Sequence, residues 1–259
     1  MPMNLPELLA QFAPSAEAHR LHIPNNWLQG RTAYGGISSV LAYQAATLAA
    51  TDLPPLQSAQ ISFVGPLSGA VEIRAAVLRR GRNTAFIESK IIGEGGVGLA
   101  CNFIFMTPRD SHLDFHALPK PDFPPIPRDD DVRNGPPEFF TQNMHYPDKR
   151  LTLGQGTPKL ASWHRLIDRD GVDAVAELLC IGDALPPSAM GLMTEKGMVS
   201  SMNWQVNLLS AAPTTKDGWW YLESETHEAA KGASSQYMTV WNSEGDAVMT
   251  GMQSVAIFA

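Results

Sequence analysis

The same order of elements occurs twice along this chain, and this repetition limits the folds that are open to it. A predicted helix precedes four strand-like runs in the first half, at 36–50, 59–64, 71–78, 84–92 and 98–105. A short strand, a helix and four more runs follow in the second half, at 163–166, 172–184, 199–209, 219–226, 234–241 and 248–258. This order predicts an α+β protein in which each antiparallel sheet wraps its own helix. Two unrelated α+β domains are the alternative, which the matching order and matching hairpin turns disfavour.

A proline-rich segment separates the two halves. Ten of the twenty prolines lie in 107–160, and three aspartates follow the densest proline run at 129–131. Such a segment is extended and cannot be helical. We therefore predict an N-terminal unit at 1–118, a connector at 119–137 and a C-terminal unit at 138–259.

Composition excludes several classes of protein. The chain has 259 residues, of which 44% are hydrophobic, so it can bury a substantial core. Its net charge of -7 argues against a general nucleic-acid binder. No run of 18 apolar residues predicts a membrane span, and the N-terminus lacks the pattern of a secretion signal. We expect a cytoplasmic protein.

The cysteines and histidines do not suggest a metal site. Cys101 and Cys180 lie in apolar surroundings and are expected to be buried free thiols. His112 and His116 are four residues apart, but prolines follow closely and no supporting carboxylate geometry is evident. We predict no metal and no cofactor.

Adjacent glycines mark the start of the first helix. Gly35 and Gly36 end an extended stretch, and an alanine-rich helix follows at once. Glycines there allow close approach to the backbone, and the free N–H groups lie at the positive end of the helix dipole. A developing oxyanion, such as a thioester carbonyl under attack, suits this position. The alternative is that the glycines only form a tight turn.

Three segments together resemble the acyl-CoA thioesterase II (TesB-like) family: GRTAYGG at 30–36, GDALPP at 182–187 and TGMQS at 250–254. The resemblance covers about 18–259. It implies a double hotdog fold in one chain, hydrolysis of an acyl-CoA by activated water, and assembly into a homo-oligomer, a dimer or larger. No nucleic acid or membrane partner is implied.

The resemblance also implies site residues. The Gly-Gly element falls on Gly35 and Gly36, the family Gln on Gln253, and a Thr on Thr226. Asn203 stands where the family has an Asp, and Gln205 stands at a neighbouring hydroxyl position. Tyr34 would line the acyl tunnel together with Trp204 and Met252. We therefore predict Asn203, Thr226 and Gln253 as catalytic residues, with Tyr34, Gly35, Gly36 and Gln205 in oxyanion or substrate binding.

Asn203 leaves alternatives open, because a carboxamide cannot take a proton as a carboxylate does. The chain could bind acyl-CoA or another apolar ligand without turnover. Glu228 is the nearest carboxylate that might substitute as a base, whereas Asp183 is expected to organise a helix end. A hotdog hydratase is less favoured, since no His lies close to Gly35.

Overall fold

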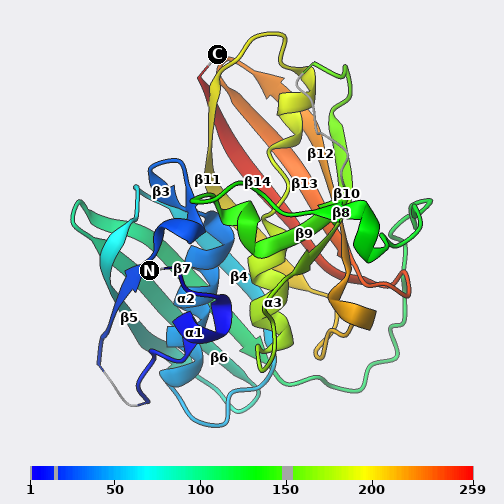
Figure 1. Cartoon of the computed structure of the whole chain (residues 1–259). Helices are drawn as coiled ribbons and strands as arrows, with labels where there is room; N and C mark the ends of the chain where they lie inside the picture. The colour runs from blue at the N-terminus through cyan, green and yellow to red at the C-terminus, as the bar shows by residue number, and fades with distance from the viewer. Residues whose placement is uncertain (1, 15–16, 148–153, 259) are drawn as a thin grey trace.

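The computed structural model describes residues 2–14, 17–147 and 154–258 (Figure 1). The described chain forms two principal helices, α2 (Gly35–Leu48) and α3 (Ala174–Gly182), and a short α1 (Leu5–Leu9). The long strands of the first half are β4 (Leu56–Phe63), β5 (Gly69–Arg80), β6 (Thr84–Gly93) and β7 (Gly96–Met106). Those of the second half are β10 (Lys159–Leu166), β11 (Met198–Leu208), β12 (Trp220–Ala230), β13 (Ala233–Trp241) and β14 (Ala247–Phe258).

Shorter elements connect these. They are β1 (His19–Ile23), β2 (Leu28–Gln29), β3 (Thr32–Ala33), β8 (Val132–Arg133), β9 (Met144–Pro147) and the 3-10 turns Asn25–Trp27, Asp129–Asp131, Phe140–Asn143, Ser188–Leu192 and Lys216–Gly218. The prediction missed β1, a five-residue strand. Its residues alternate between buried and exposed, and it pairs with β5 at one edge of the sheet.

Apart from β2 and β3, which pair with each other, the described strands form one continuous antiparallel sheet rather than two separate ones. Its order is β1-β5-β6-β7-β4-β11-β14-β13-β12-β10-β9-β8. With β1 counted beside the four long strands of the first half, each half contributes five strands in the same order, in which the second lies beside the fifth. The halves meet edge to edge where β4 pairs with β11, with Ile61 opposite Trp204.

The two helices lie side by side, with strands of the two halves on either side of the pair (Figure 1). Small residues let α2 sit deep, so that Ala42, Ala45 and Ala46 are buried between β5, β6, β7 and α3. A helix buried on nearly every side is expected to lack an amphipathic stripe. The C-cap of α2 is Ala49, and Pro54 and Pro55 lie outside the helix, as predicted.

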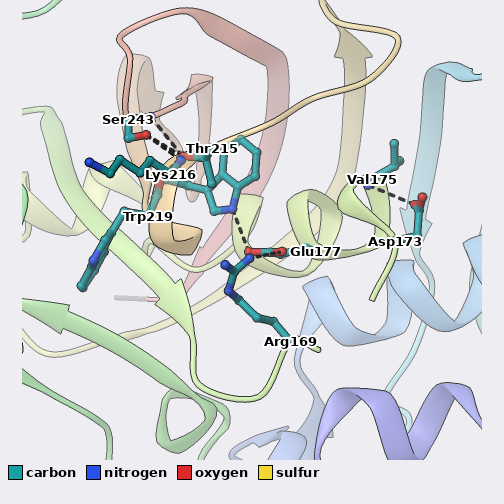
Figure 2. Close-up of polar contacts among 9 residues, drawn as sticks. Arg169, Asp173, Val175, Glu177, Thr215, Lys216, Trp219 and Ser243 are labelled. Carbon is teal, nitrogen blue, oxygen red and sulfur yellow. Dashed lines mark hydrogen bonds and ion pairs between the residues drawn. The ribbon is translucent and has the colours of Figure 1, made fainter. Parts of the chain in front are cut away.

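Helix α3 starts and packs differently. Asp173 caps its N-terminus by accepting hydrogen bonds from the N–H groups of Val175 and Ala176 at 3.0 and 3.1 Å; Figure 2 shows the bond to Val175. One turn later, the buried Glu177 pairs with Arg169 at 3.3 Å (Figure 2). Glu177 also accepts a hydrogen bond from the Trp220 indole at 3.0 Å. The buried charge is therefore compensated, as burial requires.

The state of the two cysteines was also open to prediction. Cys101 and Cys180 are buried free thiols, which confirms the prediction. Within the described ranges, no helix has the length and apolarity needed to cross a membrane.

Candidate functional site

The start of α2 presents backbone donors that no capping side chain of its own helix satisfies. Tyr34 is the N-cap residue but provides no side-chain hydrogen bond to the helix. The first N–H groups of any α-helix have no intrahelical acceptor, and they carry the positive end of the helix dipole. Gly35 therefore presents its N–H group without a side chain in the way, whereas Gly36 is buried.

A carboxylate from the other half of the molecule reaches this helix start. Asp183, the C-cap residue of α3, accepts a hydrogen bond from the backbone N–H of Gly36. A Cβ added at Gly35 would lie only 2.5 Å from Oδ2 of Asp183 and 3.0 Å from the ring of Phe63. A Cβ at Gly36 would collide with the carbonyl oxygen of Cys180. Both glycines are thus required by the close approach of α3.

Gln253 holds the same carboxylate from the sheet. Its Nε2 donates to Oδ1 of Asp183 at 2.6 Å. Its Oε1 accepts from Nε2 of Gln236 at 3.0 Å and from Oγ of Ser201 at 3.3 Å. Gln253 is only 2% exposed, so its amide is almost fully committed to these partners.

The buried polar chain continues across the sheet. Oε1 of Gln236 accepts from the backbone N–H of Ser188 at 2.9 Å. Oγ of Ser188 lies 2.8 Å from Oγ1 of Thr226 and 3.1 Å from Oγ of Ser224. Gln253, Gln236 and Thr226 are direct cross-strand partners on β14, β13 and β12, which explains why their side chains meet.

Burial raises the pKa of Asp183 to about 7, and the hydrogen bonds from Gln253 and Gly36 partly oppose this rise. A carboxyl group with a pKa near neutral pH can take up and release a proton under ordinary conditions. The geometry and the acidity therefore both mark Asp183 as a potential general base.

A cavity of about 510 Å³ opens onto this carboxylate. It lies between the two halves and is lined by Gln29, Arg31, Thr32, Ala33, Gly35, Ser38, Phe63, Val64, Gly65, Pro66, Leu67, Gly98, Leu99, Asp183, Pro187, Val199, Ser200 and Ser201. Among these described lining residues, Asp183 is the one acid and Arg31 the one cation. The mixed polar and apolar lining is typical of a small-molecule site.

Comparison with known proteins identifies the family. Residues 23–106 match the N-terminal domain of acyl-CoA thioesterases, and residues 110–257 match their C-terminal domain. The chain belongs to the TesB-like acyl-CoA thioesterase family. Among curated proteins, none matches the sequence.

Solved structures share the fold of this TesB-like chain. A candidate thioesterase II from Thermobifida fusca YX is 22% identical, with a TM-score of 0.79 over 100% of this chain and 99% of that one. A hot dog fold protein of unknown function from Alicyclobacillus acidocaldarius is 17% identical, with a TM-score of 0.79 over 95% of each chain. The acyl-CoA thioesterase II TesB2 from Mycobacterium marinum is 15% identical, with a TM-score of 0.73 over 98% and 97%. The fold is therefore of the hotdog type.

Some residues predicted from the TesB-like resemblance come together and others do not. Gly35 and Gly36 contact Asp183 from α2, and Gln253 contacts it from β14. Thr226 is buried and reaches Gln253 only through Ser188 and Gln236.

The prediction that Asn203 and Gln205 face the site is wrong. Both are exposed, and they alternate with the buried Trp204 on β11. A register shift between Ser201 and Asn203 moves the following side chains to the opposite face from Ser201. Oδ1 of Asn203 instead accepts from the backbone N–H of Ser254 at 3.0 Å on the outer face.

The prediction that Tyr34 lines the substrate tunnel is also wrong. Its side chain is 1% exposed, and its hydroxyl donates to the carbonyl oxygen of Cys180 at 2.7 Å. Its ring stacks on Phe140 at 3.9 Å between centroids. Tyr34 thus anchors the start of α2 to α3 and does not line the cavity.

Asp183 is the functional candidate that the sequence analysis missed. We expected it to organise a helix end, while Glu228, the proposed substitute base, is exposed beyond a bulge in β12. One signal could have identified Asp183: the negative end of a helix dipole disfavours a carboxylate at the C-cap. An acid placed there needs another reason to be present.

Proposed function

We propose that this chain is an acyl-CoA thioesterase with a double hotdog fold, made of units at 1–118 and 138–259 joined by a connector at 119–137. The observation that supports the site best is the 2.6 Å contact between Gln253 and Asp183 at the glycine start of α2. It joins the carboxylate of raised pKa, which lines the cavity beside Gly35, to a buried amide donor behind it.

In the proposed reaction, ionised Asp183 orients a water molecule and takes its proton as the water oxygen attacks the thioester carbonyl. The N–H groups at the start of α2 other than that of Gly36, which Asp183 accepts, stabilise the oxyanion that forms on the carbonyl oxygen. Collapse of this intermediate breaks the C–S bond and releases the free acid. The proton held by Asp183 then passes to the departing CoA thiolate.

The residues around Asp183 have separate roles in this proposal. Gln253 holds the carboxylate and favours its ionised form by donating a hydrogen bond. Thr226 supports the chain of hydrogen bonds rather than touching the water. Arg31, exposed at the cavity, is the cation suited to an anionic group of the CoA.

The test is release of free CoA from short, long and aromatic acyl-CoAs, read with a thiol reagent. We expect turnover of at least one substrate and a loss of about 10²–10⁴-fold in kcat for Asp183→Asn, the usual contribution of a general base. Asp173→Asn is the matched control, because Asp173 is the other helix-terminal aspartate and caps α3 outside the cavity. Full activity in Asp183→Asn would refute the assignment.

Silence across the whole panel, with acyl-CoA still protecting the wild type against heat, would instead support ligand binding without turnover. That alternative rests on Asn203, whose side chain is exposed. Cytoplasmic location and homo-oligomeric assembly stay predictions from the sequence.

A further inference from the structure

We propose that Gln236 is a positioning residue that sets which end of the Gln253 amide faces Asp183. The orientation of Gln236 is itself fixed by the backbone N–H of Ser188, which donates to its oxygen. This inference rests on the proposed function, because it concerns the same carboxylate. Gln236 does not line the cavity and was not predicted from the sequence.

A buried glutamine can occupy its place in two orientations, one with the oxygen and one with the NH₂ toward a given neighbour. For Gln253 the choice matters, because only the NH₂ end stabilises an ionised Asp183. The oxygen end would repel the carboxylate and would accept a hydrogen bond from its protonated form.

The orientation follows from one group that can only donate. The N–H of Ser188 lies 2.9 Å from Oε1 of Gln236, so this end of the amide must be the oxygen. Nε2 of Gln236 then points to Gln253 at 3.0 Å, and Gln253 must accept there with its own oxygen. The NH₂ of Gln253 is left for Asp183, at 2.6 Å.

The remaining members of the chain cannot make this choice. Ser224, Thr226 and the Ser188 side chain contribute hydroxyl groups, which can donate or accept. The same holds for Ser201, whose Oγ lies 3.3 Å from Oε1 of Gln253. The direction in which these hydrogen bonds are donated therefore depends on Gln236 and on the backbone N–H of Ser188.

No nearby charge duplicates this effect among the described residues. The titratable groups that interact with Asp183 are the Tyr34 hydroxyl and the Cys180 thiol. Burial raises the pKa of both, so both are neutral over the range in which Asp183 ionises. Donation from Gln253 and Gly36 is what opposes the burial of the charge.

The decisive variant is Gln236→Glu, which keeps the shape of the side chain. An ionised carboxylate can only accept, so the NH₂ of Gln253 should turn toward it and the oxygen toward Asp183. We expect kcat to fall about 10-fold or more, with KM within about two-fold of the wild type. The apparent pKa of the acid limb of the kcat–pH profile should rise by about one unit.

Two further variants separate orientation from charge and from packing. Gln236→Met is neutral, has a similar length and releases the Gln253 amide, so it should shift the profile in the same direction but less. Ser188→Ala keeps the backbone N–H and removes only the hydroxyl, so its profile should match the wild type. A shift in Gln236→Glu but not in Gln236→Met would assign the effect to added charge and overturn the proposal.

An experiment without turnover tests the proposal separately from the proposed function. The protonation of Asp183 can be titrated by its infrared carbonyl band, as the difference between each protein and its Asp183→Asn counterpart. We expect the midpoint to rise in Gln236→Met and Gln236→Glu and to stay unchanged in Ser188→Ala. Unchanged midpoints in both Gln236 variants would overturn the positioning role, whereas an inactive wild type with shifted midpoints would refute only the thioesterase. If Gln236→Glu does not fold, Gln236→Met gives the same test.

Discussion

The two principal helices begin in opposite ways. Helix α3 is closed by its own Asp173, which bonds two N–H groups of its first turn and also accepts from the Tyr43 hydroxyl of α2 at 3.3 Å. Helix α2 has no such cap, and the carboxylate at its start comes from the end of α3. One helix start is sealed locally, and the other is completed by a residue far along the chain.

The sheet shows the same contrast along a single row of inward-facing positions. From the middle of the sheet outward through the second half, the row consists of Trp204, Gln253, Gln236 and Thr226 on successive strands. From the middle of the sheet outward through the first half, it consists of Ile61, Cys101, Ser89 and Ala75. Matching positions thus hold a chain of amides in one half and small or apolar groups in the other.

This difference shows how one architecture gives unequal sites. Near the closed start of α3, Tyr43 packs against Phe103 and Phe105, so aromatic rings fill the space. Near the open start of α2, two glycines leave room for Asp183 and a cavity. The backbone plan is shared, and side-chain size and polarity decide which helix start can meet a ligand.

The largest expected effect concerns Asp183 itself. Its native pKa of about 7 exceeds the ordinary value of 3.8, so the folded protein binds more protons than the unfolded chain between these values. Stability from this group is full below about pH 4 and is lost as pH rises toward 7. Asp183→Asn should therefore stabilise the protein increasingly over this range, by about 1.4 kcal/mol per pH unit and on the order of 3–4 kcal/mol in total.

Denaturant unfolding at a series of pH values measures this trend. Asp173→Asn is the control, since asparagine also caps helices and Asp173 lies outside the cavity. A flat stability difference for Asp183→Asn would mean that burial does not raise the pKa of Asp183.

Gly35→Ala tests whether the start of α2 requires a residue without a side chain. The new Cβ would meet Oδ2 of Asp183 and the Phe63 ring, so the carboxylate must move. We expect a loss of about 100-fold in kcat/KM, the scale of a 1 Å misplacement at an active site. Gly95→Ala, in a turn with nothing within 4 Å of the added Cβ, should keep wild-type rates. Equal rates in both variants would show that the close approach is not needed.

Asp173→Ala tests the closed start. Removing this cap should destabilise the protein by about 1–2 kcal/mol in urea unfolding at pH 7. Hydrolysis by the folded variant should change by no more than about two-fold, because Asp173 does not line the cavity. A large loss of activity without loss of stability would place the second helix start in the reaction as well.

The smallest effect is expected on the outer face of the sheet. Asn203→Asp adds the carboxylate implied by the family resemblance, but the side chain is exposed and points away from the cavity. Hydrolysis should stay within about two-fold of the wild type, as for most surface substitutions. A gain of ten-fold or more would show that Asn203 turns inward when substrate binds.

Much of the fold could be predicted because it depends on local signals. Strand alternation, the alanine-rich helix and the paired prolines placed the long elements within a few residues. The pairing of β4 with β11 could not be predicted, since it joins edges of two halves whose sequences give no sign of each other. A five-residue strand such as β1 carries too short a pattern to identify.

The site was harder to predict for two physical reasons. One extra residue in β11 reverses which side chains point inward, so Asn203 could not be placed by alternation alone. Asp183 and Gln253 are 70 residues apart and lie on different elements, so neither predicts its contact with the other. Gly35 and Gly36 were accessible to sequence reasoning because their role follows from the backbone.

The junction of β4 and β11 has a consequence for the integrity of the molecule. A half separated from its neighbour would present a long row of unpaired backbone groups in the middle of what is now a continuous sheet. It would also hold either the glycine helix start or the carboxylate that completes it, but never both. The proposed site therefore needs both halves, and the single chain that links them ensures that each molecule has one of each.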